Sequence, residues 1–296
     1  AFMNTALNQT YIKINNDADS STIPNGVQFP GKAGTSNCVI GGDSGKSLVA
    51  GADNNTFIGE SVAGLGTITS ACDKNVGVGF QSLYDITSGN NNTATGYYAG
   101  WSLTSGFKNA VYGSEALRTS TDGSLNTAIG YSAMYKSSSD NWNTAVGYGA
   151  MYEQNGAESN TAVGSWALKD NEESGNNTAI GTYAMRQAGT GDYESGKNTA
   201  VGYEALYTIG QGGAGNPDGP ADETVGIGYR AGYGTTGVTN AKAMNHCVYI
   251  GSQSDASSAA YSGVVENEIV IGYKAQGQGS NKITLGNSSI THLQCN

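Results

Sequence analysis

Charge is scarce in this sequence, and the little there is leans acidic. Only 13% of the 296 residues are charged, and 24 Asp and Glu against 14 Lys and Arg leave a formal net charge of −10. Binding to nucleic acid or to an anionic membrane needs a basic cluster, which this composition does not supply. No run of about 18 apolar residues occurs, so the sequence predicts no membrane-spanning helix and no membrane insertion.

Proline and histidine are also rare, with four and two residues respectively. Collagen is excluded, because it needs glycine at every third position and abundant proline. The two histidines, His246 and His292, argue against a Ser-His-Asp triad, and no Gly-x-Ser-x-Gly sequence is present. We therefore expect no catalytic residues, no cofactor and no enzymatic activity.

Metal ligands do not cluster along the chain. His246-Cys247 and His292-x-x-Cys295 each offer two zinc ligands, but two more are not close in sequence. Acidic pairs such as Glu172-Glu173 lack an EF-hand or calcium-roll spacing, so we expect no metal site. The cysteines form no C-x-x-C pair and leave all three complete disulfide pairings open: Cys38, Cys72, Cys247 and Cys295.

Glycine is abundant, with 45 residues, and it marks an internal repeat. The phrase Asn-Thr-Ala-Val/Ile-Gly-Tyr-x-Ala-Leu/Met recurs along almost the whole chain, and from Gly79 to Gly181 it recurs at intervals of 17 residues. The repeat glycines are Gly41, Gly59, Gly79, Gly96, Gly113, Gly130, Gly147, Gly164, Gly181, Gly202, Gly228, Gly251, Gly272 and Gly286.

The length of the repeat selects the fold. Thr-Ala-Val-Gly-Tyr alternates with period two, which indicates a strand. Seventeen residues are too few for a two-helix repeat or a propeller blade, which need about 34 to 50, but they suffice for one coil of a solenoid. The sequence therefore predicts an all-β parallel β-solenoid (β-roll or β-helix) of about fourteen coils.

Asparagine stands four residues before the glycine in ten consecutive repeats. Coils stacked about 4.8 Å apart would bring these side chains into register, so that they bond amide to amide. Asparagine also tolerates the left-handed backbone conformation that tight corners need. This structural ladder comprises Asn37, Asn55, Asn75, Asn92, Asn109, Asn126, Asn143, Asn160, Asn177 and Asn198.

Three further columns suggest how the coil packs. Val or Ile usually precedes the glycine, and we expect it to fill the core together with the Leu/Met column that follows. Alanine and glycine would then form the opposite strand face, which would suit tight packing against another chain. The tyrosine after the glycine is either a packing stripe, which we favour, or an outward platform on which sugars stack.

The two ends lie outside the repeat. Residues 1–36 form an N-terminal arm, residues 37–286 the solenoid and residues 287–296 a C-terminal tail. Within the arm, one strand is predicted with nothing local to pair with, which makes it a candidate for donation to a neighbouring subunit: Thr10, Tyr11, Ile12, Lys13 and Ile14.

Five Asn-x-Ser/Thr sequences are candidate glycosylation sites, at Asn8, Asn54, Asn91, Asn176 and Asn287. Three of them, Asn54, Asn91 and Asn176, stand immediately before a ladder asparagine. The repeat itself generates these three sequences, so we interpret them as part of the repeat structure rather than as glycosylation sites.

The repeat resembles the head repeats of trimeric autotransporter adhesins, which are β-rolls, and the repeats of bacteriophage tail fibres. The stretch from Ile283 to Cys295 is similar to the segment that precedes the self-cleaving chaperone domain of some tail fibres. This resemblance implies an extracellular, fibrous, self-assembling protein on a cell surface, in a secreted filament or on a virion.

Two functions remain open at this point. The first is a non-enzymatic structural fibre protein whose partners are copies of itself, in a closed homotrimer or an open filament. The alternative is an adhesin that binds a receptor or a cell-surface glycan through its loops and tyrosines. An array of coils without capping helices favours the structural role, because its ends are open edges.

Overall fold

The computed structural model describes most of the repeat region and two short segments before it. The described residues are 2–4, 9–11, 36–172, 174–188, 196–209, 221–233, 244–256 and 265–290. The chain divides into two units, residues 1–31 and residues 32–296.

The first unit contains a two-stranded hairpin. Strand β1 (Phe2–Asn4) pairs antiparallel with β2 (Gln9–Tyr11), and Phe2 lies opposite Tyr11. The expectation of an unpaired strand from Thr10 to Ile14 was therefore wrong in one respect, because Thr10 and Tyr11 belong to a strand with a local partner. Ile12, Lys13 and Ile14 lie outside the described residues.

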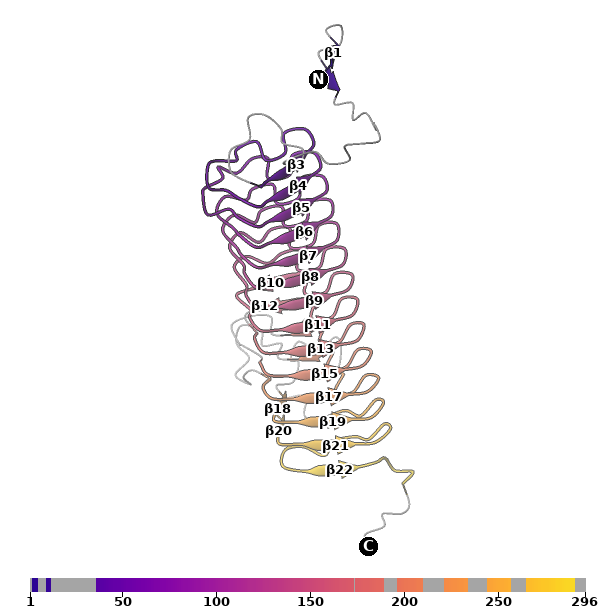
Figure 1. Cartoon of the computed structure of the whole chain (residues 1–296). Coiled ribbons are helices and arrows are strands. Elements are labelled where there is room, and N and C mark those ends of the chain that lie inside the picture. Colours follow the sequence, from indigo (N-terminus) through magenta and orange to yellow (C-terminus); the bar gives the residue numbers. More distant parts are fainter. Residues whose placement is uncertain are drawn as a thin grey trace, which may run out of the picture. The chain divides into compact units, whose positions relative to one another are not determined.

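The second unit is a parallel β-solenoid, which confirms the predicted fold. Its main wall is a 14-stranded parallel sheet with one three-residue strand per coil (Figure 1). In chain order the strands are β3 (Cys38–Ile40), β4 (Thr56–Ile58), β5 (Val76–Val78), β6 (Thr93–Thr95), β7 (Ala110–Tyr112), β8 (Thr127–Ile129), β9 (Thr144–Val146), β11 (Thr161–Val163), β13 (Thr178–Ile180), β15 (Thr199–Val201), β17 (Val225–Ile227), β19 (Val248–Ile250), β21 (Ile269–Ile271) and β22 (Ile283–Leu285).

Shorter sheets line another side of the later coils. A four-stranded parallel sheet joins β10 (Glu153–Asn155), β12 (Asp170–Glu172), β14 (Gln187–Ala188) and β16 (Thr208–Ile209). A two-stranded sheet joins β18 (Met244–Asn245) and β20 (Val265–Glu266) (Figure 1). All pairings are in register, so each position of the repeat forms a column along the solenoid axis.

The core lies on the alanine side of the strands, which corrects the predicted packing. The middle residue of each main strand points inward, and Ala128, Ala145 and Ala162 are completely buried. The Leu/Met column, represented by Met134 and Leu168, is buried beside it as expected. The Val/Ile column points outward instead. From β8 to β15 the inward strand position holds alanine, and the Leu and Met side chains fill the remaining space. Larger side chains occupy this position nearer the ends, as Phe57 and Tyr249 do.

The repeat glycines allow the coils to approach closely at the end of each strand. Gly147 has a φ of 139°, and a Cβ atom added there would lie 2.5 Å from the carbonyl oxygen of Gly164 in the next coil. Both the backbone conformation and the contact distance exclude a side chain. The glycine column therefore serves coil stacking within one chain.

Candidate functional surfaces

The ladder asparagines bond mainly to backbone groups of the next coil. The Asn143 N–H donates to Asn126 Oδ1 and the Asn160 N–H to Asn143 Oδ1, both at 2.9 Å. Within the described residues, the side-chain amides of nine of the ten ladder asparagines also donate to a carbonyl of the following corner, as Asn143 Nδ2 does to Ala157 O at 2.9 Å. Among the described residues, direct amide-to-amide bonds between ladder asparagines are donated only by Asn75, Asn92 and Asn109, for example from Asn109 to Asn92 at 3.0 Å. The predicted amide-to-amide pattern is therefore the minor one.

The left-handed corner residue is the one before the ladder asparagine. Lys108, Trp142 and Asn176 have φ values of 56°, 57° and 60°, whereas the ladder residues themselves have negative φ. The residue before the ladder asparagine therefore adopts the left-handed conformation. Its side chain is exposed, so many residue types occur there, including lysine and tryptophan. The ladder asparagine contributes hydrogen bonds but does not adopt the left-handed conformation that we expected from its sequence position.

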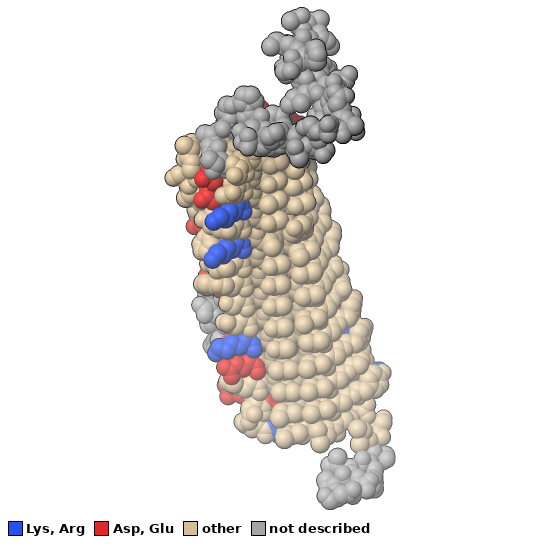
Figure 2. Space-filling view, in the orientation of Figure 1, with Lys and Arg blue, Asp and Glu red and all other residues tan. Residues whose placement is uncertain are grey.

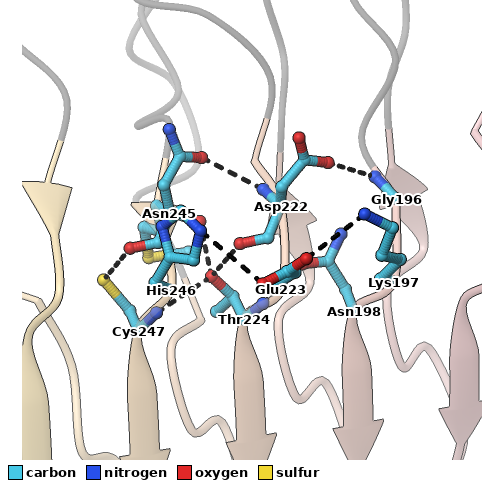
Figure 3. A network of polar contacts seen from close by, with 10 residues as sticks. Gly196, Lys197, Asn198, Asp222, Glu223, Thr224, Asn245, His246 and Cys247 are labelled. Carbon is cyan, nitrogen blue, oxygen red and sulfur yellow. Dashed lines mark hydrogen bonds and ion pairs between the residues drawn. The ribbon is translucent and has the colours of Figure 1, made fainter.

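Beyond Asn198 the ladder position is taken by Thr224 and then Cys247 (Figure 3). The Thr224 N–H donates to Asn198 Oδ1 at 2.9 Å, and the Cys247 N–H reaches Thr224 Oγ1 at 3.5 Å. At the adjacent corner position Glu223 lies 3.2 Å from Lys197 Nζ and 3.6 Å from His246 Nε2. These ion pairs are exposed and therefore contribute little to stability.

The outward side of the main sheet, which we call the sheet face, is uncharged along its whole length. It consists of the first and third residues of each main strand, and none of these is Lys, Arg, Asp or Glu. Figure 2 shows the charged residues of this view gathered beside the sheet and none over it. Six third-position residues expose between 36% and 41% of their surface: Ile129, Val163, Ile180, Ile227, Ile250 and Ile271.

A second surface, which we call the aromatic ladder, is formed by the turns that follow the main strands from β5 to β17, except β7. The tyrosine column is outward, as Tyr131, Tyr148 and Tyr203 are 49%, 49% and 41% exposed. The favoured interpretation as a buried packing stripe was therefore wrong. The ladder comprises Phe80, Tyr84, Tyr97, Tyr98, Trp101, Tyr131, Tyr135, Tyr148, Tyr152, Trp166, Tyr183, Tyr203, Tyr207, Tyr229 and Tyr233.

The ladder rings stack on one another along the axis. Tyr135 and Tyr152 are 5.0 Å apart with an interplanar angle of 3°, and Tyr131 and Tyr148 are 5.4 Å apart at 14°. Arg118 occupies one rung, with its guanidinium 5.5 Å from the Tyr135 ring. Because neighbouring rungs cover the ring faces, the ladder presents mainly ring edges and hydroxyl groups to solvent.

The cysteines that the structure describes are all free thiols: Cys38, Cys72 and Cys247. Cys38 is exposed, whereas Cys72 and Cys247 are buried. Burial raises the pKa of the Cys72 thiol to about 12, with a further contribution from the neighbouring Asp73 charge. Each of the three complete pairings needs a bond between two of these cysteines, so none of them is formed in this structure. Cys295 and His292 lie outside the described residues.

Among the described residues no three His, Cys, Asp or Glu side chains gather as a metal site would require. That part of the chain also has no helix long and apolar enough to cross a membrane. Of the candidate glycosylation sites, Asn54, Asn91 and Asn176 are exposed at left-handed corners, and Asn287 is partly exposed. Asn8 lies outside the described residues.

No protein-family model matches the chain, and no curated protein sequence is significantly similar to it. Its functional surfaces therefore have to be assessed from their own chemistry.

Sequence reasoning placed the apolar columns but assigned the wrong strand face to the core, so it missed the sheet face. The two-residue periodicity of a strand could have identified the core face. Alanine lies two residues after the ladder asparagine and therefore points to the same, buried side.

Proposed function

We propose that the chain is a non-enzymatic structural fibre protein of the extracellular space, and that copies of it associate side by side through the sheet face. The observation that supports this is the uncharged, β-branched surface of the 14-stranded sheet. Half of its first-position residues are threonine, and most of its third-position residues are valine or isoleucine. Soluble monomers rarely expose a column of aliphatic side chains of this length, and such columns are typical of protein–protein interfaces.

The dimensions of the sheet face suit a stable contact. Fourteen strands at about 4.8 Å spacing span roughly 60 Å, and a three-residue strand is about 10 Å long. The stripe therefore offers on the order of 600 Å² per copy, close to the ~800 Å² that each partner buries in a stable interface. Since the stripe occupies one face, covering it yields a closed bundle of parallel rods, of which the homotrimer is one form.

Charge substitutions in the sheet face test this proposal. Val163→Lys with Ile180→Lys puts two like charges in the centre of the stripe, where burial without a partner is costly. We expect the wild-type chain to be a discrete oligomer by light scattering after size exclusion, and the double variant to be a folded monomer. An unchanged mass for the double variant would refute association through this face.

The chain provides a matched control for that experiment. Ser159→Lys with Asn176→Lys adds the same charge at exposed left-handed corners, a position where Lys74, Lys108 and Lys197 occur naturally. This control should keep the wild-type mass. Deletion of residues 1–20 distinguishes assembly through the sheet face from assembly through the N-terminal strand. If assembly depends on that strand, the deletion variant alone will lose it.

A second candidate function, a receptor- or glycan-binding adhesin, draws support from the exposed aromatic ladder. Because its rings stack on one another, sugars would meet hydroxyl groups and ring edges. Substitution of Tyr131 and Tyr148 by Phe removes those hydroxyl groups and keeps the stacks. Binding to a glycan array that the double Phe variant loses would establish this function, and an array without binding would reject it.

A further inference from the structure

The inner column opposite the main sheet changes from apolar to polar in the middle of the solenoid. Its members occupy equivalent places in successive coils and are all buried: Ile86, Leu103, Ser120, Ser137, Gln154, Asn171, Ala188 and Ile209. Four consecutive polar side chains thus replace aliphatic ones inside a narrow core. An aliphatic side chain would fill this space at lower cost, because a buried polar group needs a hydrogen-bonding partner.

The polar side chains of this column are direct neighbours. In the sheet register Gln154 pairs with Asn171, and the bridge between Lys136 and Glu153 places Ser137 beside Gln154. Parallel strands are about 4.8 Å apart, so the three side chains lie one above the next. They form one continuous polar strip through three coils.

Asp140 adds a carboxyl group to this strip. It is completely buried, in a column where the neighbouring coils carry Gly123 and Ala157. Ser137 Oγ donates to Asp140 Oδ2 at 2.6 Å, which ties the carboxyl group to the strip. Burial raises the pKa of Asp140, although the Ser137 hydroxyl and nearby backbone N–H groups partly offset that effect.

Asp140 differs from the other buried acids of the described residues. Glu204 forms an ion pair with Arg230 at 2.5 Å. Glu268 accepts hydrogen bonds from the Gly279 N–H at 2.7 Å and the Tyr249 hydroxyl at 3.2 Å. The Asp140 carboxyl group is hydrogen-bonded by Ser137 and by backbone N–H groups. Within the described residues, its Oδ1 atom has no hydrogen-bond partner and no ion pair to the carboxyl group is found.

Two further oxygens of the strip are equally unsatisfied. Gln154 Oε1 and Asn171 Oδ1 are buried without a hydrogen-bond donor among the described residues. Leaving a buried polar atom unpaired costs about 1–3 kcal/mol, so unpaired oxygens in adjacent coils indicate a missing partner. Asp140 and Gln154 belong to adjacent coils, and Asn171 belongs to the coil after them. A cation between the adjacent coils would satisfy the oxygens of Asp140 and Gln154 and would balance the carboxylate form of Asp140.

We propose that this strip binds a hard cation through oxygen atoms of Asp140 and Gln154, which lie in adjacent coils, with Ser137 beside them. One carboxylate and neutral oxygens suit Na⁺ or Ca²⁺, whereas zinc and copper prefer nitrogen and sulfur ligands. Gln154 Nε2 also lacks an acceptor, and a water in the cation's hydration shell would provide one. A surface cavity of about 340 Å³, lined by Lys136, Ser137, Glu153 and Gln154 among others, adjoins the strip, and Lys136 is ion-paired with Glu153 there.

The test compares thermal unfolding of the full chain in choline chloride with unfolding in NaCl or CaCl₂ at equal ionic strength, after chelation and dialysis. We expect one or both cations to raise the Tm of the wild-type protein. A shift with Ca²⁺ alone or with Na⁺ alone identifies the ion. Calorimetric titration of the chelated protein should show saturable binding of the same ion.

Two variants separate the site from general salt effects. Asp140→Asn keeps the size and the hydrogen bond from Ser137, and Gln154→Met keeps the volume and removes one oxygen. Both should lose the cation-dependent Tm shift, while the exposed control Asp122→Asn keeps it. No shift in the wild-type protein, or the same shift in Asp140→Asn and Gln154→Met, would overturn the proposal and leave buried water as the partner of these atoms.

Discussion

The side-chain carbonyl of Asn143 accepts the backbone N–H of Asn160 at 2.9 Å, seventeen residues further along the chain. The same side chain donates to the Ala157 carbonyl at 2.9 Å. One asparagine therefore satisfies two backbone groups of the following coil at a buried corner. Repetition of this pattern in successive coils holds the corners in register along the axis.

Asn143→Ala should destabilise the protein by about 2–4 kcal/mol, because it leaves a buried N–H and a buried carbonyl without partners. Chemical denaturation measures the free energy of unfolding. The control Asn155→Ala removes an exposed asparagine of β10 and should change stability by no more than about 0.5 kcal/mol. Equal effects of the two variants would show that the ladder bonds do not stabilise the fold.

Gly147→Ala should be more damaging than an alanine at an unobstructed left-handed glycine. Its Cβ atom would meet Gly164 O at 2.5 Å, whereas a Cβ atom at Gly156, with a φ of 76°, meets nothing within 4 Å. We expect Gly156→Ala to cost about 1–2 kcal/mol through backbone conformation alone. The cost at Gly147 should clearly exceed that, as measured by denaturant unfolding, and similar costs would contradict close coil stacking.

A reciprocal pair of substitutions tests which strand face is the core. Ala162 is completely buried, so Ala162→Val should cost about 1–3 kcal/mol by overpacking. Val163 is 37% exposed, so Val163→Ala should change monomer stability by no more than about 0.5 kcal/mol. Unfolding is measured on an Ile180→Lys background, which carries one of the two charges expected to disrupt assembly. A larger cost for Val163→Ala than for Ala162→Val would support the core predicted from sequence.

The fold was predictable because the repeat is regular. A spacing of 17 residues, a period-two strand and a glycine in each coil leave little besides a parallel solenoid. The core face was not predicted, because alternation says only that Ala162 and Val163 point to opposite sides. Hydropathy favoured valine for the core, whereas the narrow coil left room for alanine.

The polar strip was hidden for a different reason. Asp140 and Gln154 fall in the stretch that varies most between repeats, and such stretches indicate exposed turns. The 17-residue repeat places Gln154 and Asn171 in the same column as Leu103. The sequence did not show that this variable column points inward and is buried.

Thiol reactivity should divide the described cysteines in the folded protein. Cys38 is exposed and should react with iodoacetamide, while Cys72 and Cys247 are buried and should not. The pKa of Cys72 is raised to about 12, so the thiolate stays a minor species up to about pH 10 and labelling remains slow. Peptide mapping by mass spectrometry reads out each site, and rapid native labelling of Cys72 would contradict the buried corner.

Association through the sheet face is the central claim, and electron microscopy of native, unheated protein tests it most directly. Covering one stripe closes the assembly, so the account predicts discrete rods of one length, wider than a single solenoid, with copies side by side. Long filaments of single-solenoid width with a regular axial repeat would contradict it, because the copies would then join end to end through their open strand edges.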